Sequence, residues 1–125
     1  MSDDDLIAEA RKHVGGFALS DPTFVAADVA SALVTEGGNV YTGVCFDLAC
    51  GIGLCAEHAA VAAMLQGRET VVAKIVAVTA DGVIPPCGRC RELLAQVDRR
   101  NAGCDVIVGP GAVVKLADLL PFNWR

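Results

Sequence analysis

The chain has 125 residues, a length that suits one folded domain and is enough to bury a hydrophobic core without disulfide bonds. Its formal net charge is -5 and its isoelectric point is near 4.8, so it lacks the basic excess that would bind the phosphates of a nucleic acid polymer. Hydrophobic residues make up 54% of the sequence, but the apolar runs are short, and none reaches the roughly 20 residues that a membrane-spanning helix requires. The acidic run Asp3-Asp4-Asp5 stands where a secretory signal would be basic. We therefore expect a single cytoplasmic domain over residues 1–125 that acts on a small molecule, not on a nucleic acid polymer or a membrane.

The first half of the chain predicts a helix, a hairpin and a second helix. Apolar residues of the opening segment recur on one helical face, and Gly15-Gly16 ends it. Two β-rich runs separated by a short Gly-containing connection predict a hairpin. The predicted elements are a helix over 3–14, a loop over 19–27, strands over 29–35 and 39–45, a small-residue segment over 48–53, and a buried helix over 55–67.

The second half predicts strands that alternate with helices. A continuous β-branched run is typical of a central strand that is covered on both faces. The predicted elements are a strand over 71–79, a turn-rich link over 80–86, a helix from 86 to about 101, strands over 105–108 and 112–115, and one helical turn over 116–120. This order predicts an α/β fold, a three-layer α/β/α sandwich around a five-stranded mixed sheet.

Three of the six cysteines have the spacing of a metal site. Cys55 begins one predicted helix, and Cys87 and Cys90 begin another as a Pro-Cys-x-x-Cys segment. Catalytic zinc sites keep three protein ligands and leave one position for water, whereas structural sites usually take four. Both helix starts would lower the pKa of nearby thiols, so we expect all three to bind as thiolates.

Glu57 follows Cys55 by two residues and points to another side of the same helical turn. It can stand beside a metal without binding it, which is the position of a proton shuttle. Zinc deaminases combine such a glutamate with a Pro-Cys-x-x-Cys segment. Three thiolates leave Zn²⁺ with a net negative charge, and the residues placed to compensate it are Arg89, Arg91 and His58.

These motifs resemble the small cytidine deaminase family and, within it, the blasticidin S deaminases. The resemblance covers nearly the whole chain and implies Cys55, Cys87 and Cys90 as ligands of Zn²⁺ and Glu57 as acid and base. It further implies an aminated nucleoside or analogue as substrate and a homotetramer as the assembly. The matching segments are Val29-Ala30-Ser31-Ala32, Tyr41-Thr42-Gly43-Val44, Cys55-Ala56-Glu57, the nine residues from Pro86 to Leu94, and Leu119-Leu120-Pro121.

The departures from the family pattern concern the substrate pocket. Ala27 replaces an aromatic residue, and Cys45 and Asp47 stand where the family has Asn-x-Glu to hold ribose hydroxyls. A cysteine cannot make the paired hydrogen bonds of an amide, so we expect ribose recognition to be altered. The residues assigned to substrate contact are Phe24, Cys45, Asp47 and Ala56, and the C-terminal aromatics Phe122 and Trp124 are candidates to reach a neighbouring subunit's site.

Other interpretations remain open from the sequence. The zinc could be structural, with Cys50, Cys104 or His58 as fourth ligand. The chain could be a non-catalytic, zinc-stabilised binding protein. Within the enzyme class, the substrate could be blasticidin S or another aminated heterocycle.

Overall fold

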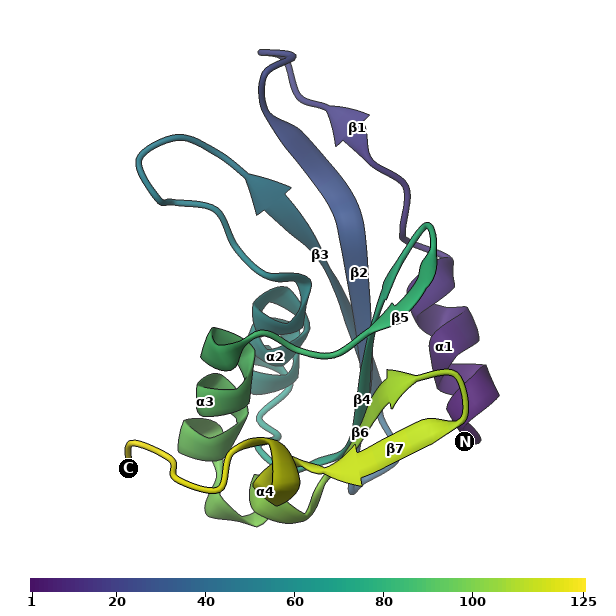
Figure 1. Ribbon diagram of the computed structural model, residues 1–125, viewed down its shortest axis with the longest axis vertical. Coiled ribbons are helices and arrows are strands. Elements are labelled where there is room, and N and C mark those ends of the chain that lie inside the picture. The colour runs from purple at the N-terminus through teal and green to yellow at the C-terminus, as the bar shows by residue number, and fades with distance from the viewer.

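A mixed seven-stranded β-sheet forms the centre of the protein, with helices on both faces (Figure 1). The computed structural model describes residues 1–125. The mixed sheet with helices on both faces confirms the predicted α/β sandwich. The elements are α1 (Asp3–Arg11), β1 (Phe17–Ala18), β2 (Val25–Thr35), β3 (Val40–Asp47), α2 (Ala56–Gln66), β4 (Val72–Thr79), β5 (Gly82–Ile84), α3 (Gly88–Val97), the 3-10 helix η1 (Arg99–Gly103), β6 (Asp105–Gly109), β7 (Ala112–Lys115) and α4 (Leu116–Leu119).

The long strand β2 organises the sheet. Ala30 pairs with Val44 of β3 on one side and with Val78 of β4 on the other. β4 pairs in parallel with β6, and the other pairings are antiparallel. The predicted hairpin of β2 and β3 is therefore confirmed, with β4 as a central strand.

The sheet has seven strands instead of the predicted five, because two short strands lie outside the segments predicted as strands, one just before the expected loop over 19–27 and one in the expected link over 80–86. β1 pairs with the start of β2, and β5 folds back on the end of β4. Strands of two or three residues are held by backbone hydrogen bonds and carry too few side chains to show an alternating pattern.

Side chains of β2 alternate between two hydrophobic cores. Leu33 packs with Met64 of α2 and Leu94 of α3, whereas Ala32 and Val34 pack against α1 on the other face of the sheet. Figure 1 shows this layering, with α1 on one side of the sheet and α2 and α3 on the other. The strand alternation therefore determines which helices cover each face.

Helix α3 ends earlier than predicted. Asp98 has an extended backbone, and its side chain accepts a hydrogen bond from the Arg100 amide as the cap of the 3-10 helix. Asp98 thus separates two helices where the sequence favours one. The longest helix, α2, has 11 residues, and no helix has the length and hydropathy to span a membrane.

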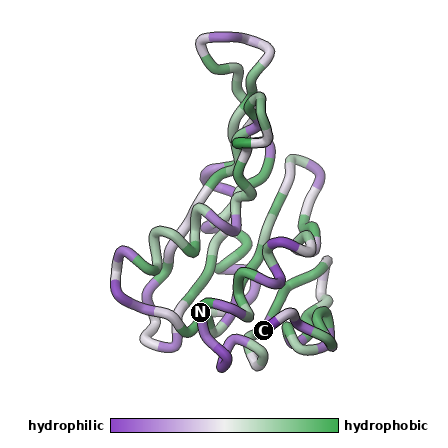
Figure 2. The backbone as a smooth tube through the Cα atoms, turned by 90° about the vertical axis from the view of Figure 1, so that its left-hand side faces the viewer, coloured by the Kyte–Doolittle hydropathy of each residue, from purple (hydrophilic) through white to green (hydrophobic).

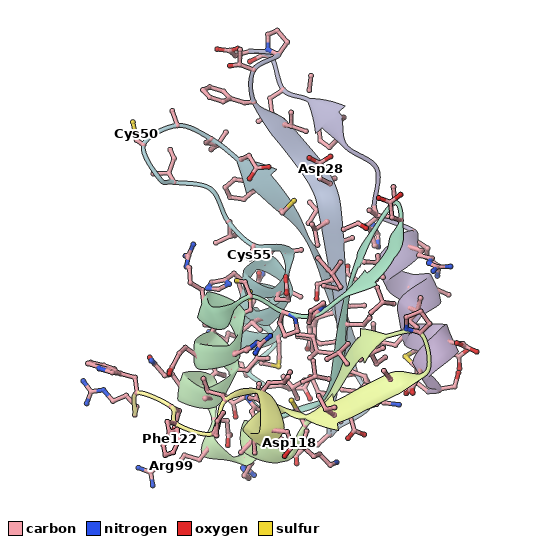
Figure 3. All side chains as sticks on the ribbon, viewed as in Figure 1. Asp28, Cys50, Cys55, Arg99, Asp118 and Phe122 are labelled. Carbon is pink, nitrogen blue, oxygen red and sulfur yellow. The ribbon has the colours of Figure 1, made fainter.

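One end of the sheet projects beyond the helices. Figure 2 shows the hairpin of β1 and β2 extending past the rest of the molecule. The loop that leads from β3 into α2 runs beside it, with Cys50 at its tip (Figure 3). Where this projection meets the starts of α2 and α3, the structure forms a cavity of about 520 Å³.

Candidate metal centre and substrate cavity

The three cysteines of the predicted metal site lie at the starts of α2 and α3. Cys55 is the N-cap residue of α2, Cys87 is the N-cap residue of α3, and Cys90 lies in the first turn of α3. Phe46 of β3 forms an isolated bridge with Leu54, which places Cys55 beside the end of that strand. The close packing of β3 on α2 also positions the helix, since a Cβ on Gly43 would lie 2.4 Å from the Ala60 nitrogen.

The structure brings the three sulfur atoms together. Cys87 Sγ lies 3.6 Å from Cys55 Sγ and 3.4 Å from Cys90 Sγ. A tetrahedral zinc ion with bonds of about 2.3 Å separates two sulfur ligands by roughly 3.8 Å. The spacing of this donor set therefore fits one zinc ion.

His58 approaches the same cluster. Its Nδ1 lies 3.5 Å from Cys90 Sγ, and ligand atoms of Cys55, His58 and Cys90 all lie within 4.8 Å of one another. These three residues could hold a metal ion, and Cys87 lies within reach of the same point. Among the fourth ligands considered from sequence, His58 is the one that the structure places at the cluster.

The pKa values of the three thiols are shifted from the ordinary value in different directions. Burial raises the pKa of Cys55 and that of Cys90, and for Cys90 the neighbouring Glu57 adds to the effect. Burial also acts on Cys87, but hydrogen bonds from the Cys90 amide, the Cys90 and Cys55 thiols and the Arg89 amide together outweigh it and lower the pKa of Cys87. The lowered pKa of Cys87 agrees with the prediction made for helix starts, whereas the pKa values of Cys55 and Cys90 shift in the opposite direction, with burial as the largest cause. A bound dication would offset that cost.

Glu57 lies in the first turn of α2 and is only 5% exposed. Its burial raises the pKa of its carboxyl group, an effect that contacts with its own backbone and the Cys90 thiol oppose. A carboxyl group with a raised pKa holds a proton more readily than an exposed glutamate does. Such a group suits repeated proton transfer near neutral pH.

Glu57 lines a cavity of about 520 Å³ that also contains Cys55 and Cys87. This volume is in the range of small-molecule sites. In Figure 3, Cys55 marks the helix side of this region and Asp28 its strand side. Its polar and sulfur-bearing lining residues are Asp28, Cys45, Asp47, Cys55, Glu57, Cys87 and Arg89.

Several residues assigned to the site from sequence line this cavity, and four, Phe24, His58, Cys90 and Arg91, do not. Cys45, Asp47, Ala56 and Arg89 are in its wall. Phe24 lies at the tip of the hairpin of β1 and β2 and is not in the wall, since its backbone closes that turn through bonds to Leu19 and Asp21.

Arg91 also lies outside the cavity wall. Its guanidinium donates hydrogen bonds to the carbonyl oxygens of Pro86 and Leu119, which joins the start of α3 to α4. These bonds give Arg91 a structural role, and its predicted charge compensation at the cluster stays a prediction. Arg89 is the permanently charged candidate there, whereas burial and the nearby Arg89 lower the pKa of His58 and favour its neutral form.

Cys45 has a contact that sequence reasoning missed. Its Sγ accepts a hydrogen bond of 3.2 Å from the Val29 amide. Asp28 was missed as a cavity residue, because it lies in an irregular part of β2 between the expected loop over 19–27 and the expected strand over 29–35. The sequence signal was the break in apolar alternation at Ala27-Asp28.

The C-terminal aromatic residues are exposed in the single chain. Phe122 is 93% and Trp124 74% exposed, and the Trp124 amide donates to Glu92 of α3. Figure 3 shows Phe122 well away from Cys55. Their contact with another subunit's site stays a prediction.

Fold and site together define a small α/β/α protein whose cavity ends on a cluster of metal-ligating side chains. No model of a known protein family matches the chain. Among curated proteins, a cytidine deaminase of Halalkalibacterium halodurans is 37% identical over 71 residues, which cover 55% of this chain and 54% of the relative. A cytidine deaminase of Mycobacterium tuberculosis is 32% identical over 96 residues, covering 74% of this chain and 69% of the relative.

Solved structures agree over the full length. The crystal structure of cytidine deaminase from Mycobacterium tuberculosis has a TM-score of 0.82 at 27% identity and covers 100% of this chain and 99% of that one. The enzyme of that name from Burkholderia pseudomallei has a TM-score of 0.79 at 28% identity, covering 99% of this chain and 100% of that one. The chain belongs to the cytidine deaminase family.

Proposed function

We propose that this chain is a zinc-dependent hydrolytic deaminase that acts on the exocyclic amine of a cytosine-type nucleoside or nucleoside analogue and releases ammonia. The observation that carries the proposal is the placement of a buried carboxyl group, Glu57, on the wall of a cavity that ends at Cys55 and Cys87. Family membership supports the same reaction.

We assign Cys55, Cys87 and Cys90 as the zinc ligands. Their sulfur spacing and the soft, anionic character of thiolates support zinc over hard cations such as Mg²⁺. When bound, zinc lowers the pKa of a water molecule enough to supply hydroxide near neutral pH.

Glu57 is assigned to proton transfer. Deamination adds the elements of water, and a carbonyl oxygen replaces the departing ammonia. Glu57 accepts the proton that water gives up and delivers protons to the ring nitrogen and the leaving amine. Its burial limits exchange of those protons with bulk solvent.

His58 and Arg89 are assigned to charge compensation. Three thiolates on a dication carry a net negative charge, which weakens the acidifying effect of the metal. His58 Nδ1 lies within 3.5 Å of Cys90 Sγ, and Arg89 occupies the first turn of α3 between Cys87 and Cys90. A hydrogen bond from His58 to the Cys90 sulfur would draw charge away from the metal.

The altered pocket favours a substrate other than free cytidine. Cys45 is engaged by the Val29 amide, so its sulfur has no amide-like pair of hydrogen bonds to offer a ribose. We propose Asp47 and Ala56 as substrate contacts, and blasticidin S or another aminated heterocycle as an alternative substrate. We further propose a cytoplasmic homotetramer in which Phe122 or Trp124 contacts a neighbouring cavity.

Ammonia release tests the proposal. The zinc-loaded protein is assayed against cytidine, deoxycytidine, cytosine, blasticidin S and other aminated heterocycles, with the Cys87→Ala variant as the control that should lose the metal. Release from at least one compound, absent in the variant, is expected. No release from any compound by a fully zinc-loaded protein would favour the non-catalytic binding scaffold.

A further inference from the structure

Arg91 of α3 connects two segments that are distant in the sequence. Its Nε donates a hydrogen bond of 2.9 Å to the Pro86 carbonyl, and its Nη1 donates one of 3.1 Å to the Leu119 carbonyl. Both bonds come from one planar guanidinium group, whose donors have fixed directions. The position of Pro86 relative to α4 therefore depends on a single side chain.

The link that leads into Cys87 has no other hydrogen bond. Pro85 and Pro86 lack an amide hydrogen, and neither residue forms a hydrogen bond with another backbone group. The bond from Arg91 to the Pro86 carbonyl is the one hydrogen bond of this link. Because the next residue is Cys87, a Pro86 carbonyl without that bond would leave the cysteine free to move.

The other two sulfur atoms of the cluster are held in other ways. Leu54, which precedes Cys55, exchanges two backbone hydrogen bonds of 3.0 and 3.1 Å with Phe46. Cys90 is fully buried in the first turn of α3. Cys87 is exposed, although its sulfur lies within 3.6 Å of the Cys55 sulfur and 3.4 Å of the Cys90 sulfur. Cys87 is thus the ligand whose place depends most on the link before it.

The far end of the Arg91 connection is anchored in the hydrophobic core. Leu116 of α4 is 1% exposed, and its amide donates a hydrogen bond of 3.1 Å to the Cys104 carbonyl. Leu119 packs against the same core, beside α3 (Figure 1). The fixed Leu119 carbonyl orients the guanidinium of Arg91, and the guanidinium in turn holds Pro86.

We propose that Arg91 is a positioning residue of the metal centre, which holds the Pro86 carbonyl in place and thereby keeps the Cys87 sulfur at the cluster. This role rests on the proposed zinc ligation. It acts through the directions of two hydrogen bonds and not through the charge of the guanidinium. Residues that hold a metal ligand without touching the metal typically change metal affinity by about 10–100-fold.

Zinc dissociation from the full chain tests this role. Zinc-loaded wild type and Arg91→Leu are mixed with an excess of a chromophoric chelator, and zinc release is followed by absorbance. We expect release from Arg91→Leu to be about 10–100-fold faster. With Co²⁺ in place of zinc, the variant should show weaker thiolate-to-cobalt charge-transfer absorbance than the wild type at equal metal content, because Cys87 no longer stays at the metal.

Arg91→Lys separates position from charge. Lysine keeps the positive charge, but its ammonium group lacks the planar pair of donors that reaches both carbonyls. Release from this variant should stay at least about threefold faster than from wild type. Restoration of the wild-type rate by lysine would show that charge suffices and would overturn the positioning role. The lysine variant also carries the test if circular dichroism shows that Arg91→Leu does not fold.

Two controls separate this role from a general effect. Arg99→Leu removes the same charge from an exposed residue of η1. Asn101→Ala lowers stability by removing buried hydrogen bonds beyond the C-terminal end of α3, including one to the Leu94 carbonyl. Both variants should release zinc at the wild-type rate. Equal acceleration in Asn101→Ala would reduce the effect of Arg91 to lost stability and would contradict the positioning role.

A wild-type release rate and an unchanged cobalt spectrum in Arg91→Leu would also overturn it, and a wild-type protein that binds neither metal ion would overturn it together with the zinc assignment. Ammonia release separates this inference from the proposed function. Deamination by the wild type, with unchanged zinc release from Arg91→Leu, rejects the positioning role alone. Faster release from Arg91→Leu, when the wild type deaminates none of the compounds, rejects the deaminase and leaves the positioning role standing.

Discussion

Replacing Glu57 by glutamine should abolish most of the turnover and leave the zinc in place. Glutamine keeps the shape of the side chain but cannot accept a proton at neutral pH. A positioned proton donor and acceptor contributes about 10²–10⁴-fold to the rate. Because Glu57 is 5% exposed, bulk water cannot readily replace it, so we expect a loss of about 10³-fold in kcat, or about 4 kcal/mol of transition-state stabilisation.

The assay measures ammonia release at saturating substrate, with zinc quantified in the same samples. Glu36→Gln is the matched control, since it makes the same change in the exposed turn between β2 and β3 and should keep wild-type turnover. Turnover by zinc-loaded Glu57→Gln within about threefold of wild type would refute the proton-transfer role, given the 10²–10⁴-fold range for that role. Loss of zinc in this variant would instead show that Glu57 is needed to hold the metal.

Three further predictions concern how the fold supports the site. Gly43→Ala should lower the free energy of unfolding in urea titrations by about 1–3 kcal/mol and weaken zinc retention, because the added Cβ would collide with α2. Gly103→Ala is the control, since nothing lies within 4 Å of the added Cβ, and it should change neither quantity. Asn101→Ala should lower the free energy of unfolding by about 3 kcal/mol in urea titrations, since its buried amide bonds the Val72 amide and the Thr70 and Leu94 carbonyls; a loss below about 1 kcal/mol would contradict this. Hydrogen bonds from Arg100 lower the pKa of Asp98, so this carboxylate stabilises the protein above pH 3.8 and the contribution is lost as the pH falls through the lowered pKa. Asp98→Asn should therefore reduce stability at pH 7, and its difference from wild type should shrink below pH 3.8, whereas a constant difference would count against the ion pair.

The strong local patterns were sufficient to predict the framework. The β-branched runs of β2, β3 and β4 and the apolar helix α2 each carry a periodicity that is set by one element alone. Cys55 and Cys87 precede helix-forming segments, so their positions at helix starts followed from the sequence. The meeting of their sulfur atoms was expected from those positions, and the structure has it.

The short strands and the pocket wall could not be predicted in the same way. β1 and β5 exist because their backbones pair with longer neighbours, and a pattern of two or three side chains does not reveal such pairing. The contacts of Arg91 with Pro86 and Leu119 likewise depend on how α4 returns to α3. The direction of the Cys90 pKa was wrong from sequence because burial is a property of the packed protein.

The sequence by itself determined the chemistry that this protein has at hand, because three cysteines and a glutamate at helix starts specify ligand atoms and a proton carrier. Only the tertiary structure decided which other residues line the cavity beside these groups. Asp28 reaches the cavity through an irregularity of β2 that Cys45 and Gly15 stabilise from separate parts of the chain. No local pattern encodes such a contact, because it forms only when the strand, the thiol and the turn are brought together by folding.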